Sequence, residues 1–112
     1  MGELDLDSKS VQIATMVILR AGNARKLVHE ALTHAESFRF KEAEESLKNA
    51  KEEMRNAHVT QTEIIQAEAR GEPAELTMLL THAQDTLMIA MSEVQMAKHL
   101  IEILKKIQPR DA

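Results

Sequence analysis

The chain has 112 residues, of which 44% are apolar and 29% charged, a composition typical of one globular domain and not of a disordered chain. It contains no cysteine, which excludes a disulfide framework, a thiolate metal site and a cysteine nucleophile. The net charge is −4 and the basic residues are scattered among acidic ones, so the charge does not indicate a nucleic-acid partner.

The amino-terminal residues do not resemble a targeting segment. The stretch MGELDLDSKS is acidic and lacks the apolar centre of a secretory signal. The sequence also has no run of about eighteen apolar residues that could cross a membrane. We therefore expect a cytoplasmic protein without direct membrane insertion, whose residues 1–8 are disordered.

The first predicted helix covers residues 9–36, and it has a narrow seam of small residues. Two Phe are the only aromatic residues in the chain, so the core must be filled by aliphatic side chains and Met, which favours packed helices over a sheet. Small residues at alternating spacings of three and four let a neighbouring helix approach closely. The seam consists of Ala14, Val17, Ala21, Ala24, Val28, Ala31 and Ala35.

The second predicted helix covers residues 40–69, and its seam contains one polar residue. The stretch ESFRF at 36–40 interrupts the helical pattern before it, and Gly71-Glu72-Pro73 ends it. Gln61 is either an interior amide that sets the register or a residue of a functional site, and the pattern leaves both open. The seam consists of Phe40, Ala43, Leu47, Ala50, Met54, Ala57, Gln61 and Ile64.

The third predicted helix, residues 73–107, is apolar on two opposite faces. One face is an uninterrupted seam of Leu76, Leu80, Ala83, Leu87, Ala90, Val94, Ala97, Ile101 and Leu104. A surface helix of a three-helix subunit needs only one such stripe. The opposite face therefore predicts contact with another subunit, and hence an oligomer. That second stripe consists of Met78, Ile89, Met96 and Ile103, flanked by Met88 and Leu100.

Asp85 lies in the middle of the second stripe, within about 40° of its apolar members on a helical wheel. A buried carboxylate must be paired, protonated or bound to a metal. Near a symmetry axis, Asp85 would meet its own copies, and such carboxylates raise one another's pKa or share a hard cation. The alternative is an aspartate at the interface rim that faces water.

His82 lies about 60° around the helix from Asp85, at the boundary between the two stripes. Solvent can reach a residue at such a position, and packed residues support it from behind. A neutral imidazole there could act as a nucleophile. Spacing alone does not distinguish this role from that of an ordinary surface histidine.

Three stretches resemble the lactose/cellobiose (chitobiose) family of enzyme IIA proteins of the sugar phosphotransferase system. Thr81-His82-Ala83-Gln84-Asp85-Thr86-Leu87-Met88 resembles the family's HAQDHLM on the third helix. Residues 21–25, AGNAR, resemble the first-helix AGxAR stretch, and residues 57–62, AHVTQT, resemble the second-helix AHxxQT stretch. The three matches occur in the family's order and spacing along nearly the whole chain.

The resemblance implies an all-α fold, an antiparallel three-helix bundle that forms a homotrimer of nine helices, with residues 1–112 as one enzyme IIA domain. It implies a phosphotransferase component in which His82 accepts a phosphoryl group from phospho-HPr. His82 then passes the group to a cysteine of enzyme IIB during uptake of cellobiose, chitobiose or lactose, with enzyme IIC in the membrane. Asp85 matches the aspartate that binds a divalent metal, which we expect to be Mg²⁺, at the trimer axis.

The remaining site residues follow from the same resemblance. His58, Gln61 and Thr86 are candidates for the cleft around His82. Gln84 points elsewhere on the helix and is expected at the subunit interface, with the second stripe. Thr86 stands where the family usually has a second histidine, beside His82 at i+4. The nucleophile His82 is still present. The difference therefore bears on the rate of phosphoryl transfer and on the reactivity of His82.

Three other readings fit the sequence less well. A histidine-phosphotransfer domain of a two-component system usually shows His-x-x-Lys-Gly, which is absent here. A di-iron bundle needs Glu-x-x-His, which is also absent. A non-catalytic helical adaptor or regulatory paralogue explains the two-faced helix equally well, but gives no reason for His82 beside Asp85.

Overall fold

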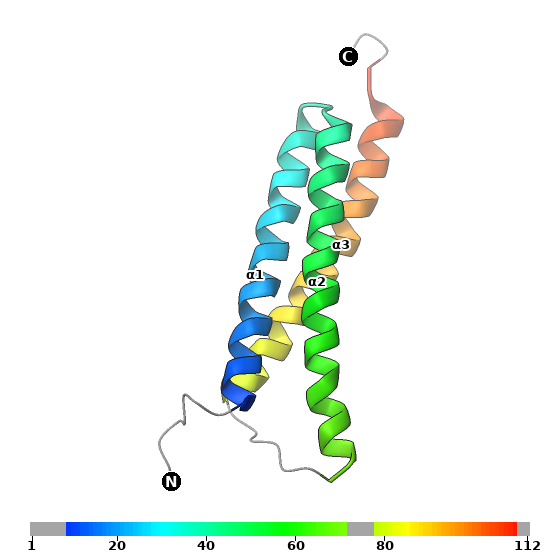
Figure 1. Cartoon of the computed structure of the whole chain (residues 1–112). Coiled ribbons are helices and arrows are strands. Elements are labelled where there is room, and N and C mark those ends of the chain that lie inside the picture. The colour runs from blue at the N-terminus through cyan, green and yellow to red at the C-terminus, as the bar shows by residue number, and fades with distance from the viewer. Residues whose placement is uncertain (1–8, 72–77, 110–112) are drawn as a thin grey trace.

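The computed structural model describes residues 9–71 and 78–109, which form three long helices (Figure 1). Helix α1 spans Lys9–Glu36, α2 spans Phe40–Ala69 and α3 spans Met78–Ile107. The described part of the chain contains no strand, which confirms the all-α prediction. The first two helices have the predicted bounds. Residues 73–77 of the third predicted helix, and the predicted disorder of residues 1–8, lie outside the described residues.

A left-handed residue closes α1 and turns the chain into α2. Phe38 has φ 59°, a conformation that glycine or asparagine adopts more easily. The backbone N–H groups of Phe38 and Arg39 donate to the carbonyl groups of Ala35 and His34, at 2.9 Å and 3.0 Å. The rings of Phe38 and Phe40 meet edge to face with centroids 6.1 Å apart. The tight turn makes α1 and α2 antiparallel neighbours.

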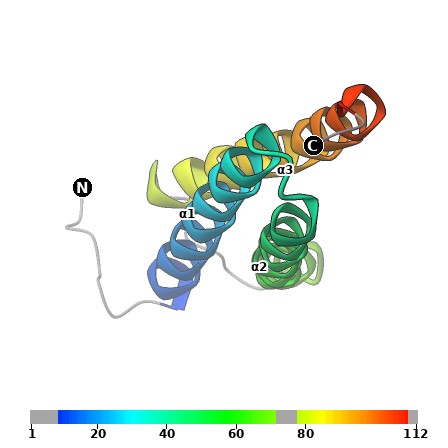
Figure 2. The same cartoon turned by 90° about the horizontal axis from the view of Figure 1, so that it is seen from above.

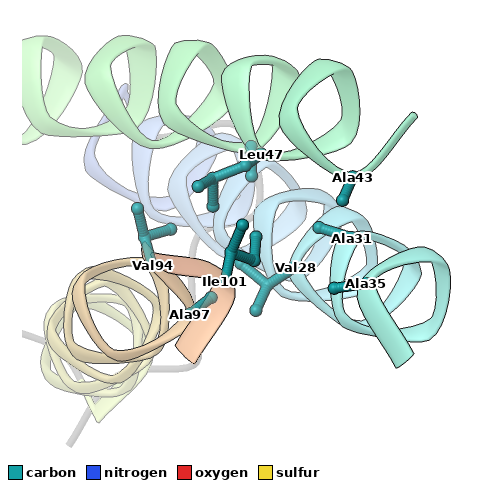
Figure 3. Packing of buried hydrophobic residues seen from close by; sticks show 9 residues of the cluster. Val28, Ala31, Ala35, Ala43, Leu47, Val94, Ala97 and Ile101 are labelled. Carbon is teal, nitrogen blue, oxygen red and sulfur yellow. The ribbon is translucent and has the colours of Figure 1, made fainter. Parts of the chain in front are cut away.

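The predicted seams form the core. Every member of the α1 seam is buried, and so are the described members of the α3 seam from Leu80 to Ile101. Alanines account for much of this core, so the helices pack closely with few large side chains. Figure 3 shows Val28 of α1, Leu47 of α2 and Ile101 of α3 meeting between the three helices.

Helix α1 is the centre of the bundle, since it packs extensively against both other helices, whereas α2 and α3 contact each other less. Viewed from above, α2 and α3 lie on different sides of α1 (Figure 2). Arg20 pairs with Glu53 of α2 at 3.6 Å, and Arg25 pairs with Glu93 of α3 at 2.7 Å. Within residues 9–71 and 78–109, this arrangement leaves one long side of α3 without a neighbour.

Candidate functional site

His82 lies one turn after Met78 in α3, and its side chain is exposed. The residues next to the core at this level, Leu80, Ala83 and Leu87, are all buried. They fix the backbone of α3 against the other two helices, so His82 projects from a rigid support. Within residues 9–71 and 78–109, the imidazole has no hydrogen-bond or ion-pair partner. Both ring nitrogens are therefore open to a reactant from solvent.

The ion pairs of α3 show on which side of the bundle His82 lies. Glu93, which pairs with Arg25 of α1, is about 20° from His82 around the helix, at 100° per residue. Lys105, which pairs with Glu44 of α2, is about 140° away by the same count. His82 therefore lies on the α1 side of α3, away from α2.

The outer face of α3 is apolar and uncovered. Met78, Ile89, Met96 and Ile103 are 89%, 47%, 59% and 53% exposed, although each is a large apolar side chain. The flanking Met88 and Leu100 are exposed as well. This mainly apolar strip, which Asp85 interrupts, extends about 37 Å from residue 78 to 103 and marks an interaction surface.

Asp85 is exposed within this strip. Met88 and Ile89, one turn after it, are apolar, whereas Thr81 and His82 lie one turn before it. The described residues give Asp85 no ion pair. Among the residues placed in the structure, no group of three or more His, Asp or Glu side chains could hold a metal within one chain.

Thr86 uses its hydroxyl locally. Its Oγ1 donates to the backbone carbonyl oxygen of His82 at 2.9 Å. This is the common i−4 bond of a helical threonine, and it holds the hydroxyl against the helix backbone. Thr86 therefore lies directly beside His82, as its position in the sequence predicts, but its donor is already engaged.

The two α2 candidates differ from each other in burial. His58 is exposed, and its carbonyl accepts a hydrogen bond of 2.9 Å from Thr62 Oγ1. Gln61 is 6% exposed, and its Oε1 has no hydrogen-bond partner within the described ranges. The α2 residues on either side of Gln61, Ala57 and Ile64, pack in one core cluster with Leu80, Ala83 and Leu87 of α3. No hydrogen bond or ion pair among the described residues joins His58 or Gln61 to the His82 side chain. Their predicted place in a cleft stays a prediction about the assembled protein.

Gln84, predicted at the interface, is exposed about 200° around α3 from His82, off the apolar strip. No contact of the described chain tests its role.

The ion pair between Arg25 and Glu93 is a feature that the sequence analysis missed. Arg25 Nε and Nη2 donate to the two Glu93 oxygens at 2.7 Å and 3.4 Å. The hydrogen bond and the negative charge of Glu93 raise the pKa of the Arg25 guanidinium. Arg25 belongs to the AGNAR stretch, whose Ala21 and Ala24 are fully buried, so this stretch joins α1 to α3. The sequence contained one indication of this pair, because Arg25 lies in a matched motif. Glu93 lies in none of the three motifs, so the sequence did not point to it as the partner.

Comparisons with known proteins place the chain in one family. The family model described as the lactose/cellobiose-specific IIA subunit of the PTS system matches residues 12–105. The lichenan-specific phosphotransferase enzyme IIA component of Bacillus subtilis is 44% identical over 102 residues, which cover 91% of this chain and 93% of that protein.

Solved structures agree with this placement. The cellobiose-specific enzyme IIA of Bacillus anthracis aligns with a TM-score of 0.87 and 43% identity, over 92% of this chain and 94% of the other. A IIA(Chitobiose)–HPr complex from the Escherichia coli phosphotransferase system aligns with a TM-score of 0.79 and 26% identity, over 91% and 99%.

Proposed function

Because this chain belongs to the lactose/cellobiose-specific IIA family of the phosphotransferase system, we propose that it is a phosphocarrier with His82 as the phosphorylated residue. HPr is the proposed donor, since a relative forms a complex with HPr, and a cysteine of enzyme IIB is the proposed acceptor. The observation that carries the proposal is the exposed imidazole of His82, without a partner in the described chain, on a helix anchored by buried neighbours.

The proposed reaction consists of two phosphoryl transfers, and each one forms a bond to phosphorus and breaks another. A neutral ring nitrogen of His82 attacks the phosphorus of phospho-HPr, and the bond from phosphorus to the donor histidine breaks. The thiolate of enzyme IIB then attacks the phosphoryl group on His82, and the new N–P bond breaks in turn. No electrons are transferred to or from a cofactor. Positioning and charge stabilisation supply most of the catalysis in such transfers.

The apolar outer face of α3 supports a homotrimer with nine helices. Met78, Ile89, Met96 and Ile103 lie on one side of the helix, and covering them with copies of α3 would remove them from water. His82 lies about 40° from Met78 and Met96 around α3, at the edge of the strip. A second copy packed on the strip would therefore form one wall of the cleft around His82.

Asp85 is the proposed ligand of a divalent metal, with Mg²⁺ as the expected ion. Its exposed carboxylate offers hard oxygen donors on the face where three copies would meet, so the donor type fits a hard cation. Such an ion would offset two of the three negative charges of the carboxylates when bound. The metal has a structural role in this proposal, and no step of the transfer passes through it.

The transported sugar is proposed to be a β-linked disaccharide of the cellobiose, chitobiose or lactose class. Matched relatives include proteins named for lichenan, lactose, cellobiose and chitobiose. The sugar itself would bind to enzyme IIC in the membrane. In the part of the chain that the structure describes, no helix is long and apolar enough to cross a membrane. We propose a cytoplasmic location for this component.

Phosphorylation in a reconstituted relay tests the proposal. The protein is incubated with phosphoenolpyruvate, enzyme I and HPr, and its intact mass is measured. We expect one added phosphoryl group that is labile in acid, and no added group on His82→Gln. His99→Gln, which removes another exposed histidine of α3, is the matched control and should be labelled like the wild type.

Two outcomes would change the conclusion. Labelling of His82→Gln would place the phosphoryl group on another residue. Absence of labelling in the wild type, combined with labelling of Thr86→His, would show that the threonine has disabled transfer. The regulatory or adaptor role would then be the better description.

A further inference from the structure

A groove between α2 and α3 gathers four positive charges. Its rim carries Lys48, Lys51 and Arg55 from α2 and Lys98 from α3, all with exposed side chains. Its floor is formed by Leu47 and Ile101, which meet in the core between the helices (Figure 3). The groove exists because α2 and α3 both pack mainly on α1 and less on each other.

The two acidic residues of the groove share one lysine, which offsets one of their two negative charges. Lys105 Nζ donates to Glu44, and it also lies 3.3 Å from Glu102 Oε1. These hydrogen bonds and the carboxylate charges raise the pKa of Lys105. Lys105, which does not line the groove itself, therefore pairs with Glu44 and Glu102 at one end of it.

The four rim cations have no such partners. Over the described ranges, no carboxylate lies within 4 Å of the charged atoms of Lys48, Lys51, Arg55 or Lys98. The whole chain has a net charge of −4, so this groove is a local excess of positive charge on an acidic protein. Such a surface attracts a negatively charged partner.

The groove is separate from the His82 side of the molecule. Lys98 is sixteen residues beyond His82 on α3, about 24 Å along the helix. It also lies about 160° around the helix, facing the α2 side. A partner in the groove therefore need not cover the imidazole.

We propose that this groove is a docking surface for an acidic amphipathic helix of a partner protein. Lys48, Lys51 and Arg55 follow one another at spacings of three and four along α2, over about 10 Å. Glutamates at the same spacing on a docked helix would face them, while an apolar side chain between the glutamates lies over Leu47 and Ile101. A compact anion would use fewer of these cations, because they are spread along two helices.

The full-length protein can be tested with a designed probe. The probe is a fluorescein-labelled peptide of about fifteen residues, with Glu and Leu at helical spacing, and its control is a scrambled peptide of the same composition. Fluorescence anisotropy measures binding. We expect Lys51→Glu combined with Lys98→Glu to weaken binding by roughly tenfold or more. Lys26→Glu combined with Lys41→Glu, an equal charge change at exposed sites outside the groove, should leave it nearly unchanged.

Milder variants guard against effects on folding. Lys51→Gln with Lys98→Gln should weaken binding less than the charge reversal does. Lys105→Gln should also weaken it, because this change releases Glu44 and Glu102 into the groove. Phosphorylation of His82 should proceed normally in all of these variants, so failure of the groove proposal is distinguishable from failure of the proposed phosphorelay.

Several results would overturn the proposal. Equal binding of the scrambled peptide, or equal loss in the two charge-reversed variants, would show attraction by net charge alone. Displacement of the peptide by inorganic tripolyphosphate, with the same dependence on Lys51 and Lys98, would assign the groove to a small anion. Protection of a probe attached at Lys51 in the assembled protein, and its exposure on dilution, would assign it to a second copy.

Discussion

The inner and outer faces of α3 are both apolar, yet only the inner face has partners within the described chain. The inner seam from Leu80 to Ile101 is buried against α1 and α2, and much of it is alanine. The outer strip consists of longer Met and Ile side chains, remains at least 47% exposed, and contains Asp85.

This difference separates the face that stabilises one subunit from the face that we propose assembles several. The inner face needs small residues because two helices of the same chain approach it closely. The outer face carries flexible or branched side chains and one carboxylate, which a free subunit tolerates because water surrounds them. A change to the inner face should therefore unfold the subunit, whereas the same change to the outer face should only dissociate it.

Introducing one carboxylate on each face gives the largest expected effect. Ala90 is fully buried, and Ala90→Asp places an unpaired charge in the core, at a cost of roughly 3–5 kcal/mol. Ile89→Asp, the adjacent position on the outer face, should keep the helical content and lose the assembly. Circular dichroism during urea unfolding and sedimentation velocity measure the two effects. Unfolding of both variants to the same extent would contradict the distinction between the faces.

Removing the carboxylate from the outer face tests whether its charge weakens the proposed assembly. Asp85→Leu should strengthen the proposed trimer by about 1–4 kcal/mol, since three carboxylates at its axis would repel one another when no cation is bound. The variant should also lose any dependence of assembly on a chelator. Analytical ultracentrifugation with and without chelator tests this, with Asp85→Asn as the variant that keeps the side-chain size. Dissociation of Asp85→Leu to monomers would remove charge repulsion as the explanation.

A matched pair of small residues on α1 gives the smallest expected effect. A Cβ added at Gly22 would meet nothing within 4 Å, so Gly22→Ala should stabilise the subunit by about 1 kcal/mol through helix propensity. Ala24→Gly, in the buried seam two residues on, should destabilise it by at least about 1 kcal/mol. Urea denaturation measures both. A destabilised Gly22→Ala would indicate that another copy approaches α1 at this position.

Much of the subunit could be predicted from spacing. The seams of α1 and α3 predicted which residues are buried, because a helix turns by a fixed angle per residue and the period carries over directly to three dimensions. The same arithmetic placed Met78 and Asp85 on a face opposite the core, and the structure leaves that face uncovered. The motif stretches carried the family placement that the comparisons confirm.

The sequence by itself determined three helices, their buried faces and the exposed position of His82, because these depend on local periodicity. Only the tertiary structure decided which side of the bundle each residue faces. It placed His82 on the α1 side, paired Arg25 with Glu93, and brought Lys98 beside Lys51 and Arg55. These pairings join residues far apart in the chain, and they depend on how the helices cross and on their relative heights. The periodicity of a single helix determines neither the angle at which two helices cross nor their relative heights.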